Sequence, residues 1–182
     1  SYLLVTHVRV RVVVWLDPWT YSDTSGYQIV QSLFGLANGG MLGTGLGSGF
    51  PNLVPFANTD FIVSALGEEL GATGLIAMLL LYAVLIERGL RTAVSVRDSF
   101  GQLLAAGLSI VLALQVFVII GGVTRLIPLT GLTTPFLSYG GSSLVANWII
   151  IALLLRISDR ARRPQVVAPS PDEALTQVVR RP

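Results

Sequence analysis

Three long stretches without a charged residue constrain this chain more than any other feature. They cover residues 70–86, 99–124 and 126–155. A charge at the centre of a bilayer costs about 2.5 to 3.5 kcal/mol, and roughly 20 apolar residues cross the hydrocarbon layer. In the third stretch, prolines and a glycine pair interrupt the first half. We therefore expect membrane-spanning helices at about 68–86, 100–121 and 136–155.

The composition supports an all-α polytopic membrane protein. Hydrophobic residues make up 52% of the chain and charged residues only 12%, about half the charged share of a soluble domain. That charge cannot cover the outer faces of three buried helices in a soluble protein. All 12 basic residues are arginine and form no basic block, which argues against a nucleic-acid partner.

The residue inventory excludes several kinds of chemistry. With no lysine, the chain has neither a Walker A loop nor a Schiff-base nucleophile. Without cysteine, and with His7 as its single histidine, it lacks the material for disulfides, Cys/His zinc sites and a Ser-His-Asp triad. We assign no metal ligand, and the sequence leaves any cofactor open. The remaining chemistry depends on carboxylates, arginine, hydroxyls, amides and backbone groups.

Arginine placement predicts the orientation, because short cytoplasmic loops carry the excess of basic residues. Arginines lie between the first two expected spans and after the third, at positions 88, 91, 97, 156, 160, 162 and 163. Residues 1–65 then form an external region, and 66–157 hold the spans. Residues 158–182, rich in proline and charge, are expected to be a disordered cytoplasmic tail. Ser1 reads as the cut end of a preceding helix.

The external region contains two patterned segments. Residues 27–37 place Ile29, Val30, Leu33 and Phe34 opposite Gln28, Gln31 and Ser32, which predicts a short amphipathic helix on the membrane or on the bundle. The glycine-rich run 39–49 fits no nucleotide-binding spacing, although bare N–H groups can cradle anions. Its alternative is a loop whose glycines allow close backbone approach. Similarly, Gly67 and Gly71 could form a small-residue helix contact.

Asp60 is the leading candidate for chemistry. It precedes the apolar run that leads into the first span, and its nearest charges in sequence are Asp23 and Glu68. Such a carboxylate at the membrane rim has no local partner. The structural alternative is a helix N-cap at Thr59 or Asp60. Glu68 and Glu69 start the span, where acidic side chains favourably meet the helix dipole.

Four blocks of the sequence resemble the SEDS family, the FtsW/RodA polymerases of bacterial cell-wall peptidoglycan. They are WLDPW with GYQIVQS, GGMLGTGLGSG with PFANTDFIVSALGEELGATG, GGVTRLIPLTGLTTPFLSYGGSSL, and LLLRISD. The resemblance implies the C-terminal part of a roughly ten-helix fold and points to an actinobacterial RodA-like member. Members usually have Asn where this chain has Ile119.

The resemblance also implies an activity: polymerisation of lipid II into glycan strands at the outer face of the plasma membrane, for elongation or division. Asp60 would be the catalytic acid-base group, which agrees with the reading from its position. Arg11 and Arg125 are the available cations for the diphosphate, since a guanidinium can hold two phosphate oxygens. Tyr139 and Ser142, together with Ser138 and Ser143, are expected to bind sugar or to line the cavity. Gly140–Gly141 as a packing or kink site is the alternative there.

Implied partners are lipid II, the growing strand, membrane lipid and a penicillin-binding transpeptidase. Two rival functions stay open. One is a flippase or transporter of a lipid-linked precursor, although transporters generally keep ionisable residues within their spans and the three uncharged stretches 70–86, 99–124 and 126–155 have none. The other is a non-catalytic membrane scaffold, which would not need a lone carboxylate at the rim.

Overall fold

Each apolar stretch of the sequence forms one long helix. The computed structural model describes residues 2–49 and 58–163. Over these ranges the elements are helices only: α1 (Tyr2–Leu16), α2 (Tyr27–Gly39), α3 (Ile62–Ser95), α4 (Ser99–Val123) and α5 (Gly141–Arg162). The last three are long and apolar enough to cross a membrane. The predicted all-α membrane fold is confirmed.

The helix ends differ from the expected spans. α3 runs from 62 to 95 rather than from 68 to 86. α5 starts at Gly141 rather than 136, because Phe136 has a left-handed φ of 64° and Gly140 is extended. It continues to Arg162, so the expected disordered tail is wrong for residues 158–162. The expected tail's residues 164–182 lie outside the described part of the chain.

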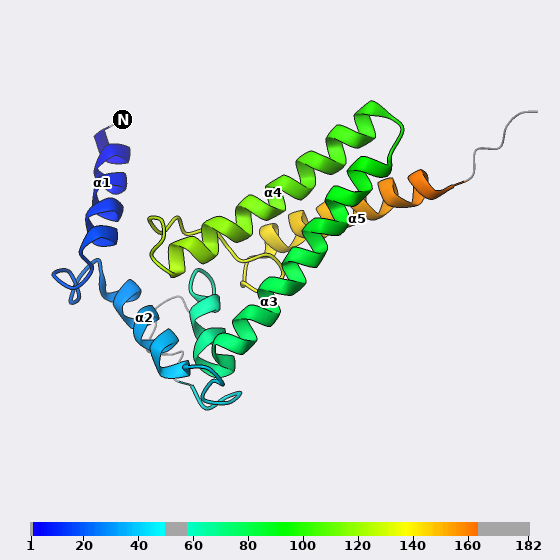
Figure 1. Cartoon of the computed structure of the whole chain (residues 1–182). Helices are drawn as coiled ribbons and strands as arrows, with labels where there is room; N and C mark the ends of the chain where they lie inside the picture. Colours follow the sequence, from blue (N-terminus) through cyan, green and yellow to red (C-terminus); the bar gives the residue numbers. More distant parts are fainter. Residues whose placement is uncertain (1, 50–57, 164–182) are drawn as a thin grey trace, which may run out of the picture.

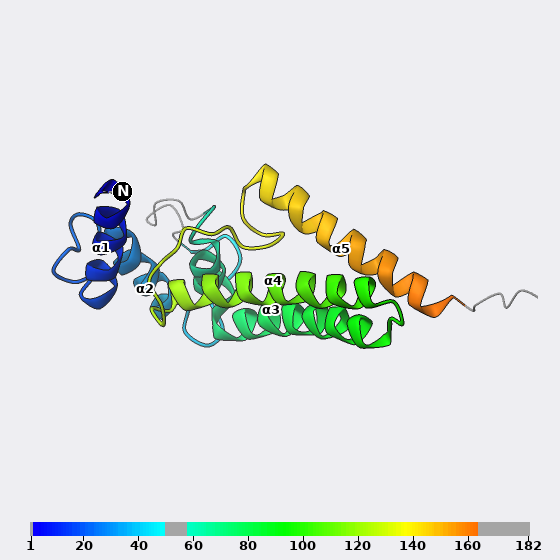
Figure 2. The ribbon, with the colours of Figure 1, turned by 90° about the horizontal axis from the view of Figure 1, so that it is seen from above.

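α3 and α4 form the antiparallel pair at the centre of the structure, and α5 approaches them at its C-terminal end (Figures 1 and 2). Small residues let the two backbones come close: a Cβ on Gly89 would lie only 2.2 Å from Ser109 Oγ. Ala93, Ala105 and Leu154 form a buried apolar cluster from all three helices. Asp98 starts α4 as an N-cap, accepting a hydrogen bond from the Gly101 amide at 3.0 Å.

The glycine-rich run inserts into a break in α3. Gly71 has φ 68° and ψ −171°, which only glycine adopts readily. In a continuous helix the amides of Ala72 and Thr73 would bond to the carbonyls of Glu68 and Glu69. Here these four groups pair with the loop instead, as Ala72 N to Gly40 O, Thr73 N to Met41 O, Thr44 N to Glu68 O and Gly45 N to Glu69 O, at 2.9 to 3.2 Å.

This insertion decides between the two interpretations of residues 39–49. A Cβ on Gly39 would lie 2.0 Å from Gly67 O, and one on Gly43 would lie 2.1 Å from Glu69 O. The glycines therefore permit close backbone approach, and the run's amides at Thr44 and Gly45 are used by α3. Gly71 is the break itself rather than part of a small-residue helix contact.

α2 is the predicted short helix, and its buried face agrees with the prediction in part, since Ile29 and Val30 are buried as expected but two other positions differ. Ser32 is 1% exposed and Phe34 is 55% exposed. The reason is that α2 packs on the first turns of α3: Ser64 Oγ donates to Ser32 O at 2.7 Å, and Gly39 abuts the α3 backbone. Phe34 instead meets Trp19 edge-on. Packing on the bundle is the observed environment of α2.

Candidate active site at the Asp60 end

Asp60 lies in the turn 58–61 that leads into α3. The next residue, Phe61, is 1% exposed and belongs to an apolar cluster with Val63, Val14, Ile29, Ile119 and Val123. Phe61 anchors the backbone while the Asp60 side chain stays half-buried. The N-cap position of α3 falls on Phe61. Neither Thr59 nor Asp60 occupies that position, so the capping alternative is wrong.

Arg11 reaches the same end of the molecule from α1. Its Nη1 donates to the carbonyl oxygens of Thr130 at 2.8 Å and Leu129 at 3.2 Å, in the loop that joins α4 to α5. The next loop residue, Gly131, has a left-handed φ of 71°. A Cβ at Gly131 would lie 3.5 Å from Asp60 Oδ2 and 3.8 Å from Arg11 Nη2. We call this Cβ position the point above Gly131. The Asp60 carboxylate and the Arg11 guanidinium thus both lie within 4 Å of it.

Arg125 holds the end of α1 to the loop 124–140, a structural role that was not predicted from the sequence. Its Nη2 donates to the carbonyls of Trp15 at 2.9 Å and Leu16 at 3.3 Å, and Trp15 Nε1 donates back to Arg125 O at 2.9 Å. The guanidinium therefore binds the last carbonyls of α1, where a cation favourably meets the helix dipole. Arg125 Nε is buried and has no hydrogen-bond partner in the described part of the chain.

Tyr139 and Ser142 are both exposed, on either side of the glycine pair. The Tyr139 side chain projects into solvent, whereas its amide donates to Asn58 O at 2.8 Å. Gly140 and Gly141 are the cap and first residue of α5. The glycine pair therefore starts this helix and is not a kink within one, while Gly140 packs closely, since a Cβ there would lie 3.3 Å from Thr133 Cγ2.

The other acidic candidates are occupied elsewhere. Glu68 is 4% exposed and accepts a hydrogen bond from Asn38 Nδ2 at 3.0 Å. It lies six residues beyond Ile62, about 9 Å along the axis from the start of α3. Asp17 accepts from the Thr20 hydroxyl at 2.6 Å. That bond and the hydrogen bond from the Thr20 amide lower the pKa of Asp17 below its ordinary value. Both bonds stabilise the turn that follows α1. Among the described residues, no three His, Asp or Glu side chains gather to hold a metal ion.

A polar network beside the candidate site was not predicted. Gln115 donates to Thr133 O at 3.0 Å, and Thr133 Oγ1 donates to Ser143 Oγ at 2.7 Å. Asn147, 2% exposed, also donates to the Ser143 backbone oxygen at 2.8 Å. The first two bonds fasten the loop 124–140 to α4 and α5, and the third lies within α5. No local sequence pattern could reveal the first two bonds, since they join residues 18 and 10 positions apart across different elements.

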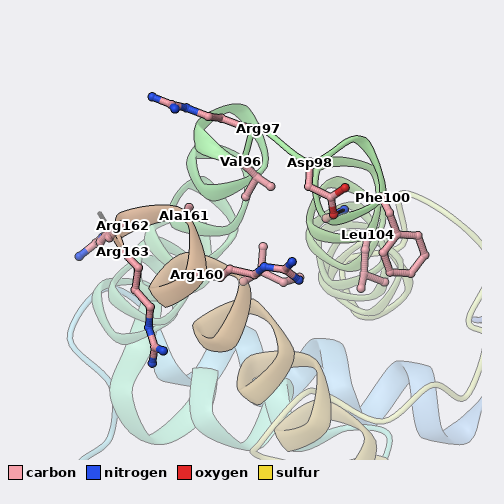
Figure 3. Close-up of a pocket in the computed structure, with 11 residues that line it drawn as sticks. Val96, Arg97, Asp98, Phe100, Leu104, Arg160, Ala161, Arg162 and Arg163 are labelled. Carbon is pink, nitrogen blue, oxygen red and sulfur yellow. Dashed lines mark hydrogen bonds between the residues drawn. The ribbon is translucent and has the colours of Figure 1, made fainter. Parts of the chain in front are cut away.

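A cavity of about 690 Å³ lies at the opposite, arginine-rich end of the helices. Figure 3 shows Arg160 between α5 and α4, near Phe100 and Leu104, and Arg97 pointing away. None of the sequence-predicted site residues lines this cavity. Because it contains none of these residues, we do not assign the catalytic site to this cavity. The candidate site is the Asp60 end.

Membrane-length helices, a half-buried carboxylate and a neighbouring guanidinium define a multi-pass membrane protein with a polar site at one end of its helices. The profile of the FTSW_RODA_SPOVE family of cell cycle proteins matches residues 1–163. The chain belongs to this family, and the predicted membership is confirmed.

Named relatives and solved structures agree with this assignment. The chain is 61% identical over 176 residues to peptidoglycan glycosyltransferase RodA of Mycobacterium tuberculosis, covering 97% of this chain and 38% of the relative. It is 44% identical over 154 residues to the probable peptidoglycan glycosyltransferase FtsW of Geobacter sp., covering 84% of this chain and 42% of that relative. This chain is thus an actinobacterial RodA-like member, as predicted, and spans well under half of either protein.

Two solved structures share the fold. A chain from a peptidoglycan synthase complex, studied for its coordination of polymerization and crosslinking, matches with a TM-score of 0.71 and 31% identity over 86% of this chain and 43% of that chain. A mutant of the rod shape determining protein RodA of Thermus thermophilus matches with a TM-score of 0.55 and 34% identity, covering 58% of this chain and 36% of that one.

Proposed function

We propose that this chain supplies the catalytic carboxylate of a peptidoglycan glycosyltransferase that polymerises lipid II at the outer face of the plasma membrane. The observation that carries the proposal is the point above Gly131, which Asp60 Oδ2 and Arg11 Nη2 both approach within 4 Å. Relatives named as peptidoglycan glycosyltransferases support the reaction class. The higher identity with RodA than with FtsW supports the elongation branch.

The reaction needs a base for the attacking sugar hydroxyl and positive charge for the diphosphate that leaves. Asp60 takes the hydroxyl proton as the new glycosidic bond forms, and the bond from the donor sugar to the diphosphate breaks. Arg11 binds the diphosphate through Nη2, since its Nη1 already holds the loop. Arg125 contributes through the donors that α1 does not use, and Tyr139 and Ser142 contact the sugars.

A side chain at position 131 should lower the rate of glycan synthesis, because it would fill the space between Asp60 and Arg11. In Gly131→Ala, the new methyl group would occupy the point between Asp60 and Arg11, so we expect glycan synthesis to fall by at least about 10-fold. Gly47→Ala is the matched control: Gly47 has a similar φ of 74° but nothing within 4 Å of its Cβ position. Steady-state polymerisation rates of the complete protein should separate the variants. Equal loss in both would mean that backbone strain, not the filled space, causes the effect.

The proposed orientation is testable by thiol labelling, because the chain has no cysteine of its own. Cysteines placed at Ser48 and Thr130 should react with a membrane-impermeant reagent in intact cells. A cysteine at Ser95, at the arginine-rich end, should react only after the membrane is opened. Labelling of position 95 in intact cells would overturn an external Asp60 end.

One experiment decides between the polymerase and the transporter. The complete protein, reconstituted in liposomes with fluorescent lipid II, is assayed both for glycan strands and for movement of lipid II between leaflets. We expect strands without accelerated movement, and more strands when a penicillin-binding transpeptidase is added. Accelerated movement without strands would favour the transporter, and neither activity would favour the scaffold.

A further inference from the structure

Ser138 joins two segments of the chain directly beside Asp60. Its hydroxyl donates to Thr59 O at 2.6 Å and accepts a hydrogen bond from the Thr134 amide at 2.7 Å. The following amide, of Tyr139, donates to Asn58 O at 2.8 Å. Ser138 is 8% exposed, so these bonds lie away from bulk water. Two hydrogen bonds therefore fasten the segment before Asp60 to the end of the loop 124–140.

The bond to Thr59 acts on the peptide unit that carries Asp60. The carbonyl of Thr59 and the amide of Asp60 belong to one rigid plane, so holding that oxygen fixes the plane from which the Asp60 side chain projects. On the other side, Phe61 is buried in the apolar cluster. Asp60 thus has a fixed backbone neighbour before and after it, although its own side chain is half-exposed.

The loop 124–140 also contains Gly131, which lies across the candidate site from Asp60. Gly131, which faces Asp60 Oδ2 and Arg11 Nη2, lies only seven residues before Ser138. Arg11 holds the loop beside Gly131, and Ser138 holds it to the segment before Asp60. The distance between the carboxylate and the point above Gly131 therefore depends on the Ser138 hydrogen bonds.

We propose that Ser138 is a positioning residue that holds Asp60 at its reacting distance, rather than a sugar-binding residue. The inference rests on the proposed function, in which Asp60 is the base. The Ser138 hydroxyl is enclosed and already makes two backbone hydrogen bonds, so no substrate contact is assigned to it. A displacement of about 1 Å in a reacting group can reduce catalysis by as much as about 100-fold.

The test compares Ser138→Cys and Ser138→Thr in the complete protein. Cysteine nearly preserves the shape of serine but is a weak donor, whereas threonine retains the hydroxyl. We expect Ser138→Cys to lower kcat for lipid II polymerisation by about 10- to 100-fold while KM changes less than about 2-fold. Ser138→Thr should recover most of kcat. A change confined to KM would instead indicate substrate binding by Ser138 and overturn the proposal.

Ser64→Cys is the matched control, because Ser64 is also a buried serine whose hydroxyl donates to a distant backbone carbonyl, that of Ser32, at 2.7 Å. We expect this control to lose comparable thermal stability but to keep kcat within about 3-fold of wild type. If both cysteine variants lost kcat equally, Ser138 would be merely structural.

Asp60→Asn, assayed in parallel, separates this inference from the proposed function. An inactive Asp60→Asn beside an unimpaired Ser138→Cys would reject only the positioning role. An active Asp60→Asn would reject the function on which that role rests.

Discussion

Replacing Asp60 with asparagine should lower glycan polymerisation by about 10²- to 10⁴-fold, the usual loss when a general base is removed. Asparagine preserves the size of the side chain but cannot accept the proton of the sugar hydroxyl. Because Asp60 is not the N-cap of α3, the substitution should leave folding, membrane insertion and lipid II binding near normal. The measurement is the rate of strand formation by the purified complete protein, with binding of lipid II measured separately.

Asp23→Asn is the matched control, since Asp23 is an exposed carboxylate in the loop between α1 and α2. It makes the same change in charge and should retain wild-type activity. Near wild-type strand formation by Asp60→Asn would contradict the assignment of Asp60 as the base. Glu68 and Glu69 would then be the next carboxylates to replace.

Gly43→Ala should lower the free energy of unfolding by about 3 kcal/mol or more. The Cβ would lie 2.1 Å from Glu69 O and 2.7 Å from the Gly71 amide, so the loop or the break in α3 must shift. Such overpacking typically costs about 1 to 3 kcal/mol, and the left-handed φ of 81° adds about 1 to 2 kcal/mol for a residue with a side chain. Thermal or chemical unfolding in micelles would measure the loss.

Gly47→Ala isolates the backbone contribution to that loss. Gly47 has nearly the same φ, 74°, but nothing lies within 4 Å of its Cβ position. We expect a cost of only about 1 to 2 kcal/mol, from the left-handed conformation alone. If the two variants were equally stable, the loop would not be inserted tightly between Glu68–Glu69 and Ala72–Thr73.

The sequence predicted the parts of the fold that depend on local composition. The run from Ser99 to Val123 has no charged residue and forms α4 almost as expected. The break in α3 at Gly71 could not be predicted from the sequence. The backbone groups that hydrogen-bond to the broken helix come from residues 40–45, far from it in the chain. For the same reason, Ser32 looked like a polar surface residue until the packing of α2 on α3 placed it in the interior.

The candidate site was predictable only in part. Asp60 stands out by its position before an apolar run, and Arg11 was a candidate because few cations are available. Their approach to one point above Gly131 depends on a loop about 70 residues after Asp60 and about 120 after Arg11. Ser138 carries no sign of its role in the sequence, since a serine before a glycine pair also suits an exposed turn.

The isoleucine at position 119 has a packing role. Ile119 is 3% exposed and packs in the cluster with Val14 and Phe61 that anchors the segment of Asp60. An amide there would lose this apolar packing and would need hydrogen-bond partners in its place. Ile119 thus contributes to the apolar packing that holds the segment of Asp60.

Lipid II supplied only to the outer leaflet of liposomes, with the complete protein inserted so that its Asp60 end points outward, shows whether that end polymerises it. Glycan strands are then separated by length. We expect strands that lengthen with time, with release of one diphosphate-linked lipid carrier for each disaccharide unit added. Lipid II that stayed monomeric on that face, while the same protein formed strands from lipid II supplied to the opposite face, would exclude an external Asp60 site.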